Sequence, residues 1–231
     1  AKDFKIKDVR KLNRVAGYLN INIEGKSVNK VAEEVALKFI EQFGQQNGEL
    51  VYLSRAPKRR QELWRKFGIA PRGIDREVVT GMHTTNVGVD NDPEHIILSS
   101  VRTALADGWG GSMIATDLSD ILFGTPTPRV GQVNLGVLKT DEVNIVLHGH
   151  EPTLSEMIVA ASTEPELIEY AKSKGAKGIN LAGICCTSNE ILLRQGVPSA
   201  GNFLNQELAL ITGAADSASS SPRARVFPRF T

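Results

Sequence analysis

The sequence has 231 residues and a formal charge of +1, from 27 basic and 26 acidic side chains. Hydrophobic residues make up 41% and charged residues 23%, a balance typical of a chain that buries a substantial core. The near-neutral charge argues against nucleic acid or an anionic membrane as the main partner. No apolar stretch approaches the roughly 18 residues that span a bilayer, and no secretory signal is evident. With only two cysteines, adjacent in sequence, we expect reduced thiols and a cytoplasmic protein.

Residues 1–125 are predicted to form a mainly helical region. Ser27 is a suitable N-cap for a helix that ends at Gly44, and Asp92 precedes a proline that begins another helix. A short basic helix is expected to end at Gly68. Asp117 and Asp120 are expected to cap or bound a helix. The apolar positions of the first of these helices, expected on one buried face, are Val28, Val31, Ala32, Val35, Ala36, Phe39, Ile40 and Phe43.

Residues 126–215 are predicted to form a partial Rossmann-like α/β domain. The apolar runs "VNIVLHGH" at 143–150 and "GINLAGIC" at 178–185 read as buried parallel strands, separated by a helical stretch that ends at Gly175. Thr187 and Glu190 suggest a capping box for a following helix. Strand, helix, strand, helix predicts right-handed βαβ units. The serine-, proline- and arginine-rich residues 216–231 are expected to be an unstructured tail.

The ends of the two predicted strands carry four residues able to do chemistry. His148, His150, Cys185 and Cys186 should lie at one rim, because ligands bind beyond the carboxyl ends of parallel strands. Imidazole and thiolate are preferred ligands of soft and borderline transition metals, and a helix starting after Cys186 would lower a nearby thiol pKa. The alternative is structural: buried cysteines filling space and histidines bonded to backbone carbonyls. The residues alone leave both interpretations open.

Three stretches closely resemble the catalytic subunit of anaerobic nickel–iron carbon monoxide dehydrogenase. They are "TDLSDILFGTPTP", "NLGVLKTDEVNIVLHGHEPTLSEMIV" and "GAKGINLAGICCTSNEILLRQGVPSAGNFLNQELALITGA". The resemblance is strong from about Thr116 to Ala215 and looser toward the N-terminus. It implies the fold of the prismane-like, hybrid-cluster superfamily. Ser188 stands where the family pattern leads us to expect glycine.

The resemblance implies an oxidoreductase that converts carbon monoxide and water to carbon dioxide, two protons and two electrons at a nickel–iron–sulfur cluster. It assigns His150 and Cys186 as ligands of the iron outside the cubane. That iron is expected to act as a Lewis acid that lowers the pKa of bound water. Cys185 is expected to be a neighbour or alternative ligand, and His148 a residue that positions the strand end. No catalytic residue is assigned within this sequence.

The two cysteines are too few for the cluster set of the family, because iron–sulfur clusters need about four thiolates each. We therefore expect an internal segment of a longer family member, inactive alone, with the family's 4Fe-4S clusters held elsewhere. The family implies a homodimer and an electron carrier such as a ferredoxin. Three alternatives remain: a non-enzymatic interaction module using the exposed edge of a two-stranded sheet, a hybrid-cluster-type reductase fragment, and a zinc site formed by His148, His150 and Cys186.

Overall fold

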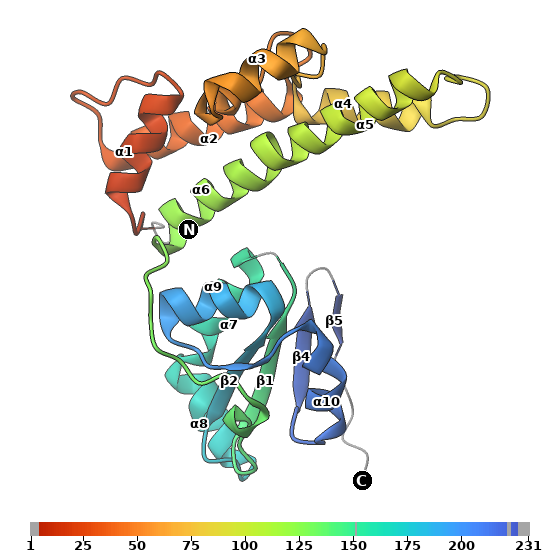
Figure 1. The fold of residues 1–231 in the computed structure, drawn as a ribbon. Coiled ribbons are helices and arrows are strands. Elements are labelled where there is room, and N and C mark those ends of the chain that lie inside the picture. The colour runs from red at the N-terminus through yellow and green to blue at the C-terminus, as the bar shows by residue number, and fades with distance from the viewer. Residues whose placement is uncertain (1–4, 151, 221–222, 226–231) are drawn as a thin grey trace. The chain divides into compact units, whose positions relative to one another are not determined.

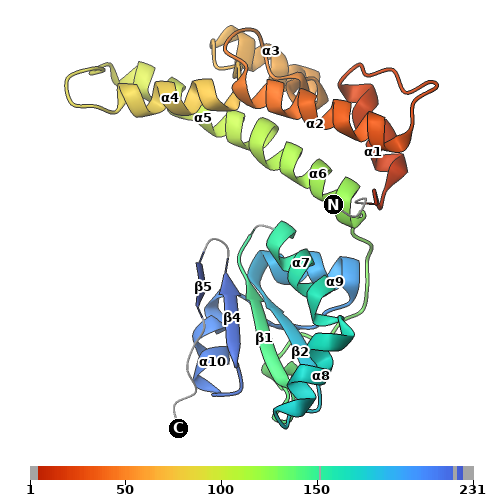
Figure 2. The same ribbon diagram turned by 180° about the vertical axis from the view of Figure 1, so that it is seen from behind.

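The computed structural model describes residues 5–150, 152–220 and 223–225, and the chain divides into two compact units, residues 1–124 and 125–231. The first unit is helical and the second contains a sheet with helices packed on it (Figures 1 and 2). Across the described part of the chain, no helix combines the length and the apolar character needed to cross a bilayer.

The first unit consists of helices joined by short turns. A short 3-10 helix, η1, precedes α3, and the π-helical turn η2 joins α5 to α6, so that α5, η2 and α6 follow one another without a break (Figure 1). The elements in chain order are α1 (Val9–Tyr18), α2 (Val28–Gly44), η1 (Val51–Arg55), α3 (Lys58–Lys66), α4 (Ile74–Thr84), α5 (Pro93–Ala106), η2 (Asp107–Ser112) and α6 (Met113–Phe123). The helices predicted after Ser27 and Asp92 are therefore confirmed.

Helix α2 begins where its sequence predicts, because the Ser27 side chain accepts a hydrogen bond from the backbone N–H of Lys30. The expected apolar face is only partly correct. Val31, Val35 and Phe39 are buried, whereas Ile40 and Phe43 are 68% and 53% exposed. The helix therefore buries the narrow stripe that faces α1, with Ala32 partly buried beside it, while Ile40 and Phe43 lie on the surface of this unit.

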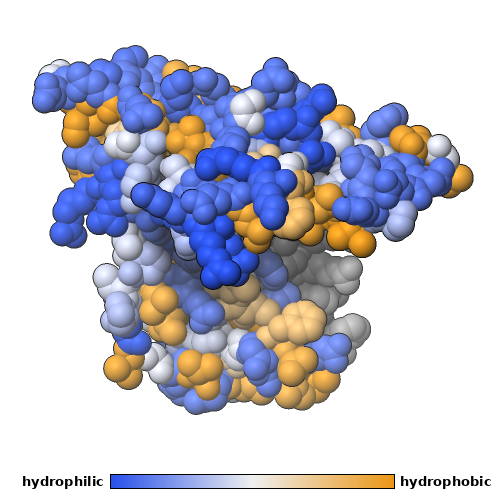
Figure 3. All heavy atoms as spheres, turned by 45° about the horizontal axis from the view of Figure 1, so that its top comes forward, coloured by the Kyte–Doolittle hydropathy of each residue, from blue (hydrophilic) through white to orange (hydrophobic). Residues whose placement is uncertain are grey.

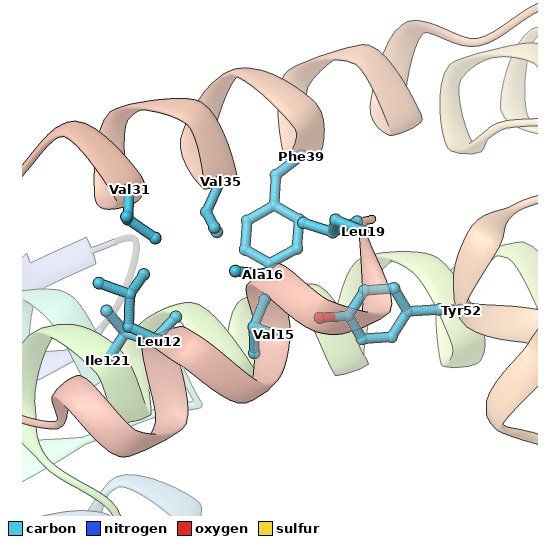
Figure 4. Packing of buried hydrophobic residues seen from close by; sticks show 9 residues of the cluster. All are labelled: Leu12, Val15, Ala16, Leu19, Val31, Val35, Phe39, Tyr52 and Ile121. Carbon is cyan, nitrogen blue, oxygen red and sulfur yellow. The ribbon is translucent and has the colours of Figure 1, made fainter. Parts of the chain in front are cut away.

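A cluster of buried side chains holds α1, α2, η1 and α6 together. Figure 4 shows Phe39 of α2 pointing toward α1, with the Tyr52 ring beside the same helix. The Phe39 and Tyr52 ring centroids are 6.0 Å apart in a tilted arrangement. The buried members of the cluster are Leu12, Val15, Ala16, Leu19, Val31, Val35, Phe39, Tyr52 and Ile121. Because α1 is short, its stability depends mainly on this packing.

Asp117 and Asp120 lie inside α6 and do not cap it, so the prediction for them is wrong. Both are buried, and Lys11 Nζ lies 2.7 Å from Asp117 Oδ1 and 2.9 Å from Asp120 Oδ2. Asp117 Oδ2 also accepts hydrogen bonds of 2.7 Å from Tyr52 Oη and Arg55 Nη1. A buried carboxylate is stable only with such partners. This network joins α6 to α1 and η1.

The hairpin formed by α4 and α5 exposes several large apolar side chains. Figure 3 shows orange, hydrophobic residues on this hairpin among blue, hydrophilic ones. Val78, Val79 and Met82 of α4 are 44%, 54% and 69% exposed. Such residues are common singly on protein surfaces, and they contribute nothing to the buried core of this unit.

The second unit is built on a sheet with strand order β3-β2-β1-β4-β5. The first four strands are parallel, and β5 pairs antiparallel with β4. The strands are β1 (Val143–His148), β2 (Ile179–Ile184), β3 (Ser199–Gly201), β4 (Ser217–Ser220) and β5 (Arg223–Arg225). The other elements are η3 (Leu135–Val137), α7 (Pro152–Ser162), α8 (Pro165–Ser173), α9 (Cys185–Gln195), η4 (Phe203–Asn205) and α10 (Gln206–Ile211). The predicted βαβ arrangement is confirmed.

The alternation of side chains along β1 divides the second unit into two small cores. Leu147 packs with Val159 of α7 and Ile191 of α9. Val146, the next residue along the strand, packs with Ala182 and Ala209 on the other face. The sheet is thus covered on both faces, as parallel sheets require.

Two predictions about the sheet are wrong. The expected two-stranded sheet has additional strands on both sides, because β3 pairs with β2 and β4 pairs with β1. The expected unstructured tail at 216–231 contains β4 and β5, while residues 221–222 and 226–231 lie outside the described part. The edge of β1 that would serve an interaction module is therefore already paired.

Candidate metal-binding rim

The two motifs that end the strands lie at the same rim of the sheet. β1 and β2 are parallel, with His148 opposite Ile184, so the chain leaves both strands at the same level. The β1 strand continues into His148-Gly149-His150, and β2 continues directly into α9, which starts at Cys185. The structure therefore brings together the two segments that the sequence predicted to meet.

A backbone hydrogen bond connects these segments. The Thr187 N–H in the first turn of α9 donates to the Gly149 carbonyl at 2.9 Å. Gly149 has φ 128°, a conformation that residues with a Cβ rarely adopt. His150 directly follows Gly149 and Cys186 directly precedes Thr187, so the predicted ligands flank this hydrogen bond. We call the segments 148–150 and 185–187 the metal-binding rim.

The four histidine and cysteine side chains of the rim differ in exposure. His150 and Cys186 are exposed, while His148 and Cys185 are half-buried. Cys185 packs against the apolar cluster that contains Ile184. The two residues predicted as ligands are thus the more exposed two of the four.

Cys185 does not have the lowered pKa predicted for a thiol at this rim. Burial raises its pKa, and the neighbouring Cys186 thiol raises it further, against a lowering contribution from the Cys186 backbone N–H. The structure also starts the helix at Cys185, before the predicted position. Cys185 itself has φ 66°, a left-handed conformation that costs a non-glycine residue about 1–2 kcal/mol.

The surroundings of His148 lower its pKa and so favour the neutral imidazole. Burial lowers its pKa, and the nearby His150 lowers it further. Its Nε2 atom is buried and has no hydrogen-bond partner among the residues that the structure describes. A buried polar atom without a partner is uncommon in proteins and often marks a place for water or another bound group.

The helix start near Thr187 differs from the predicted capping box. Thr187 lies inside α9 and is fully buried, and α9 has no side-chain cap. Glu190 pairs instead with Arg194 at the i,i+4 spacing. Thr187 cannot act as the N-cap, because the helix already begins at Cys185 and Thr187 lies in its first turn.

Ser188, which stands where we expected glycine, is also buried inside α9. A Cβ placed on Gly183 would lie 2.6 Å from the Ser188 Cα, so β2 and α9 approach closely at this point. Within the described residues, the hydroxyl oxygens of Thr187 and Ser188 are buried without hydrogen-bond partners. Close packing of α9 on β2 therefore lowers the stability of this unit by leaving two buried hydroxyl groups without hydrogen bonds to the described residues.

A buried acidic residue that no sequence motif singles out couples α7 to α9. Glu156 in α7 is 4% exposed and accepts a hydrogen bond from Gln195 Nε2 at 2.9 Å. Arg194 Nη1 lies 3.7 Å from Glu156 Oε1. Burial raises the Glu156 pKa despite these partners. The only sequence signal was a carboxylate among apolar residues of a helix, which is too weak to indicate burial.

The rim supplies few metal donors by itself. No group of three or more histidine, cysteine, aspartate or glutamate side chains converges on a metal position within the described residues. The alternative zinc site formed by His148, His150 and Cys186 is therefore not assembled, which corrects that prediction. What the geometry offers is an exposed imidazole and an exposed thiol that flank one hydrogen bond.

Comparison with known proteins identifies the family. The model of the Prismane/CO dehydrogenase family matches residues 1–219. The chain belongs to this family. It is similar to carbon monoxide dehydrogenase 1 of Methanosarcina mazei, with 57% identity over 94% of the chain. It is similar also to the beta subunit of the carbon monoxide dehydrogenase/acetyl-CoA synthase of Moorella thermoacetica, with 48% identity over 94% of the chain.

Solved structures of the Prismane/CO dehydrogenase family share this fold. A nickel-free carbon monoxide dehydrogenase from Thermococcus sp. AM4 has 52% identity and a TM-score of 0.88, and the match covers 94% of this chain. The chain spans 34% of that structure and 34% of the Methanosarcina mazei protein. It thus corresponds to about a third of the length of these relatives. The predicted resemblance to the family is confirmed.

Proposed function

We propose that this chain is a segment of a nickel–iron carbon monoxide dehydrogenase, which oxidises carbon monoxide with water to carbon dioxide, two protons and two electrons. The segment's role is to provide two iron ligands, His150 and Cys186. The observation that carries the proposal is the hydrogen bond from Thr187 N–H to the Gly149 carbonyl, since it joins the two backbone segments that carry these exposed side chains.

The donor chemistry of the rim fits an iron–sulfur centre. Imidazole nitrogen and thiolate sulfur suit iron and nickel better than they suit magnesium or calcium. The sequence has two cysteines, and a cubane cluster needs about four thiolates, so further ligands come from protein outside these residues. When bound, a nickel–iron–sulfur cluster supplies Lewis acidity and accepts electrons.

The remaining residues of the rim support the two ligands. The neutral His148 adds no positive charge beside a cationic metal, and its buried Nε2 is available to a bound water. Gly149 allows the tight turn that directs His150 outward, and Cys185 packs beneath the rim. We include in the proposal a ferredoxin-type electron carrier and a homodimeric holoenzyme, with 4Fe-4S clusters held outside this segment, in the cytoplasm.

Iron binding by the chain tests the ligand assignment. Purified anaerobically and titrated with ferrous iron, the chain should show thiolate-to-iron charge-transfer absorption. Replacing His150 with alanine or Cys186 with serine should weaken binding by more than the roughly 10- to 100-fold that loss of a supporting residue costs. His83→Ala, at an exposed histidine of the first unit, is the matched control. Equal affinity in all variants would refute the assignment.

A chimera tests the activity. The segment replaces the corresponding residues of the Methanosarcina mazei relative, with which it shares 57% identity. Carbon monoxide oxidation is followed with a viologen dye, together with nickel, iron and sulfide content. We expect the chimera to assemble the nickel–iron–sulfur cluster and turn over, and the isolated chain, which binds ferrous iron only, to do neither. A folded, metal-loaded chimera without turnover would contradict the proposed function.

A further inference from the structure

The first two residues of α9 place two free thiols on adjacent positions of the chain. Cys185 is half-buried and Cys186 is exposed, so neither residue is fully enclosed by the described part of the chain. These are the only cysteines of the sequence. The pair is thus an isolated dithiol, with no other thiol of the chain to compete for a bridging atom.

The geometry of adjacent residues disfavours a disulfide between these thiols. Neighbouring Cα atoms lie about 3.8 Å apart across a trans peptide, below the roughly 4.4–6.8 Å range of ordinary disulfides. Cys185 and Cys186 both belong to α9, whose hydrogen-bonded first turn limits any adjustment of their peptide. A larger atom inserted between the two sulfurs removes the need for this short sulfur–sulfur bond.

We propose that Cys185 and Cys186 form a chelating site for a trivalent, thiophilic metalloid, specifically a monosubstituted arsenical. Arsenic carrying one organic group needs only two further bonds, which is the number of sulfurs that the rim provides. Thiolates select soft centres over hard cations. The described residues offer no converging set of three or more metal donors that would favour a hard ion at the same place.

The binding step is balanced without an oxidant. An aryl arsenoxide, R–As=O, reacts with the two thiols to give R–As(S–)₂ and one water. Two arsenic–sulfur bonds form, the arsenic–oxygen bond breaks, and both thiol protons leave in the water. Arsenic remains trivalent and both sulfurs keep their oxidation state. The second bond is intramolecular, so the chelate should be retained roughly 10²- to 10⁴-fold more strongly than a single-sulfur adduct.

Intact-mass measurement of the whole chain with phenylarsine oxide tests the proposal. One adduct per chain should survive excess 2-mercaptoethanol and be removed by 2,3-dimercaptopropanol. Cys185→Ser and Cys186→Ser should each lose the 2-mercaptoethanol-resistant adduct, with circular dichroism confirming that both variants fold. Removal of the wild-type adduct by the monothiol, or its retention in either single-cysteine variant, would overturn the inference.

The inference stands apart from the proposed iron site, because it needs both cysteines and no histidine. His150→Ala should therefore keep the chelate while losing ferrous iron, and Cys185→Ser should show the reverse. A chain that binds the arsenical but no iron would contradict only the proposed function. A chain that binds iron but no arsenical chelate would contradict only this inference.

Discussion

Replacing Asp117 with asparagine should destabilise the first unit without touching its apolar core. The carboxylate is 3% exposed and lies 2.7 Å from each of three groups, Lys11 Nζ, Arg55 Nη1 and Tyr52 Oη. Asparagine keeps the shape of the side chain. It removes the negative charge, however, and directs an amide N–H₂ at groups that are themselves donors.

The expected cost follows from what each partner retains. Removing one member of a buried ion pair costs about 3–5 kcal/mol. Lys11 keeps Asp120 at 2.9 Å, and Arg55 is 24% exposed and lies 4.7 Å from the Tyr18 ring centroid, so neither cation loses all its compensation. We therefore expect a loss near the lower limit, about 3 kcal/mol. With a urea m-value of roughly 1–3 kcal/mol/M, the midpoint should fall by roughly 1–3 M.

Tryptophan fluorescence measures this effect in the relevant unit alone, because Trp64 and Trp109, the two tryptophans of the sequence, both lie there. Glu33→Gln is the matched control, since Glu33 is 58% exposed and pairs with Lys30 on the surface of α2. The control should leave the urea midpoint unchanged. An Asp117→Asn midpoint equal to that of the control would show that the buried network contributes no net stability.

Three further measurements address other buried polar groups. Ser188→Ala should stabilise the second unit by about 1–2 kcal/mol in circular dichroism unfolding, without moving the fluorescence midpoint, because it removes a buried hydroxyl that lacks a partner. Burial opposes ionisation of Glu77, yet Arg72 and Arg102 lower its pKa overall. The first unit should therefore lose stability as the pH falls from the unfolded-state value through the lowered one, and Glu77→Gln should flatten this dependence. The pKa of Glu156 is raised instead, so its contribution fades as the pH rises through the folded-state value. The free energy of unfolding of Glu156→Gln, measured by chemical denaturation, should accordingly increase relative to that of the wild type from pH 4 to pH 7. A difference in unfolding free energy that does not change with pH would contradict the raised pKa.

Local sequence signals determined most of the elements and the place of the site. Ser27 and Asp92 cap helices through side chains that reach only a few residues along the chain. The apolar runs at β1 and β2 identify buried parallel strands, and a parallel pair necessarily brings its carboxyl ends to one rim. His150 and Cys186 could therefore be placed together from the sequence alone.

Contacts between distant residues decided what the sequence left open. Phe43 follows Phe39 at the i,i+4 spacing of one helix face, yet it is exposed, because only the stripe that α1 covers is buried. The local sequence around Asp117 is typical of a helix boundary. Its buried position inside α6 depends on contacts with Lys11, Arg55 and Tyr52, which belong to other elements. The Thr187–Gly149 hydrogen bond, which joins the first turn of α9 to the end of β1, likewise connects residues far apart in sequence. Capping and periodicity act within a few residues, whereas burial and polar pairing depend on which distant segments the folded chain brings together.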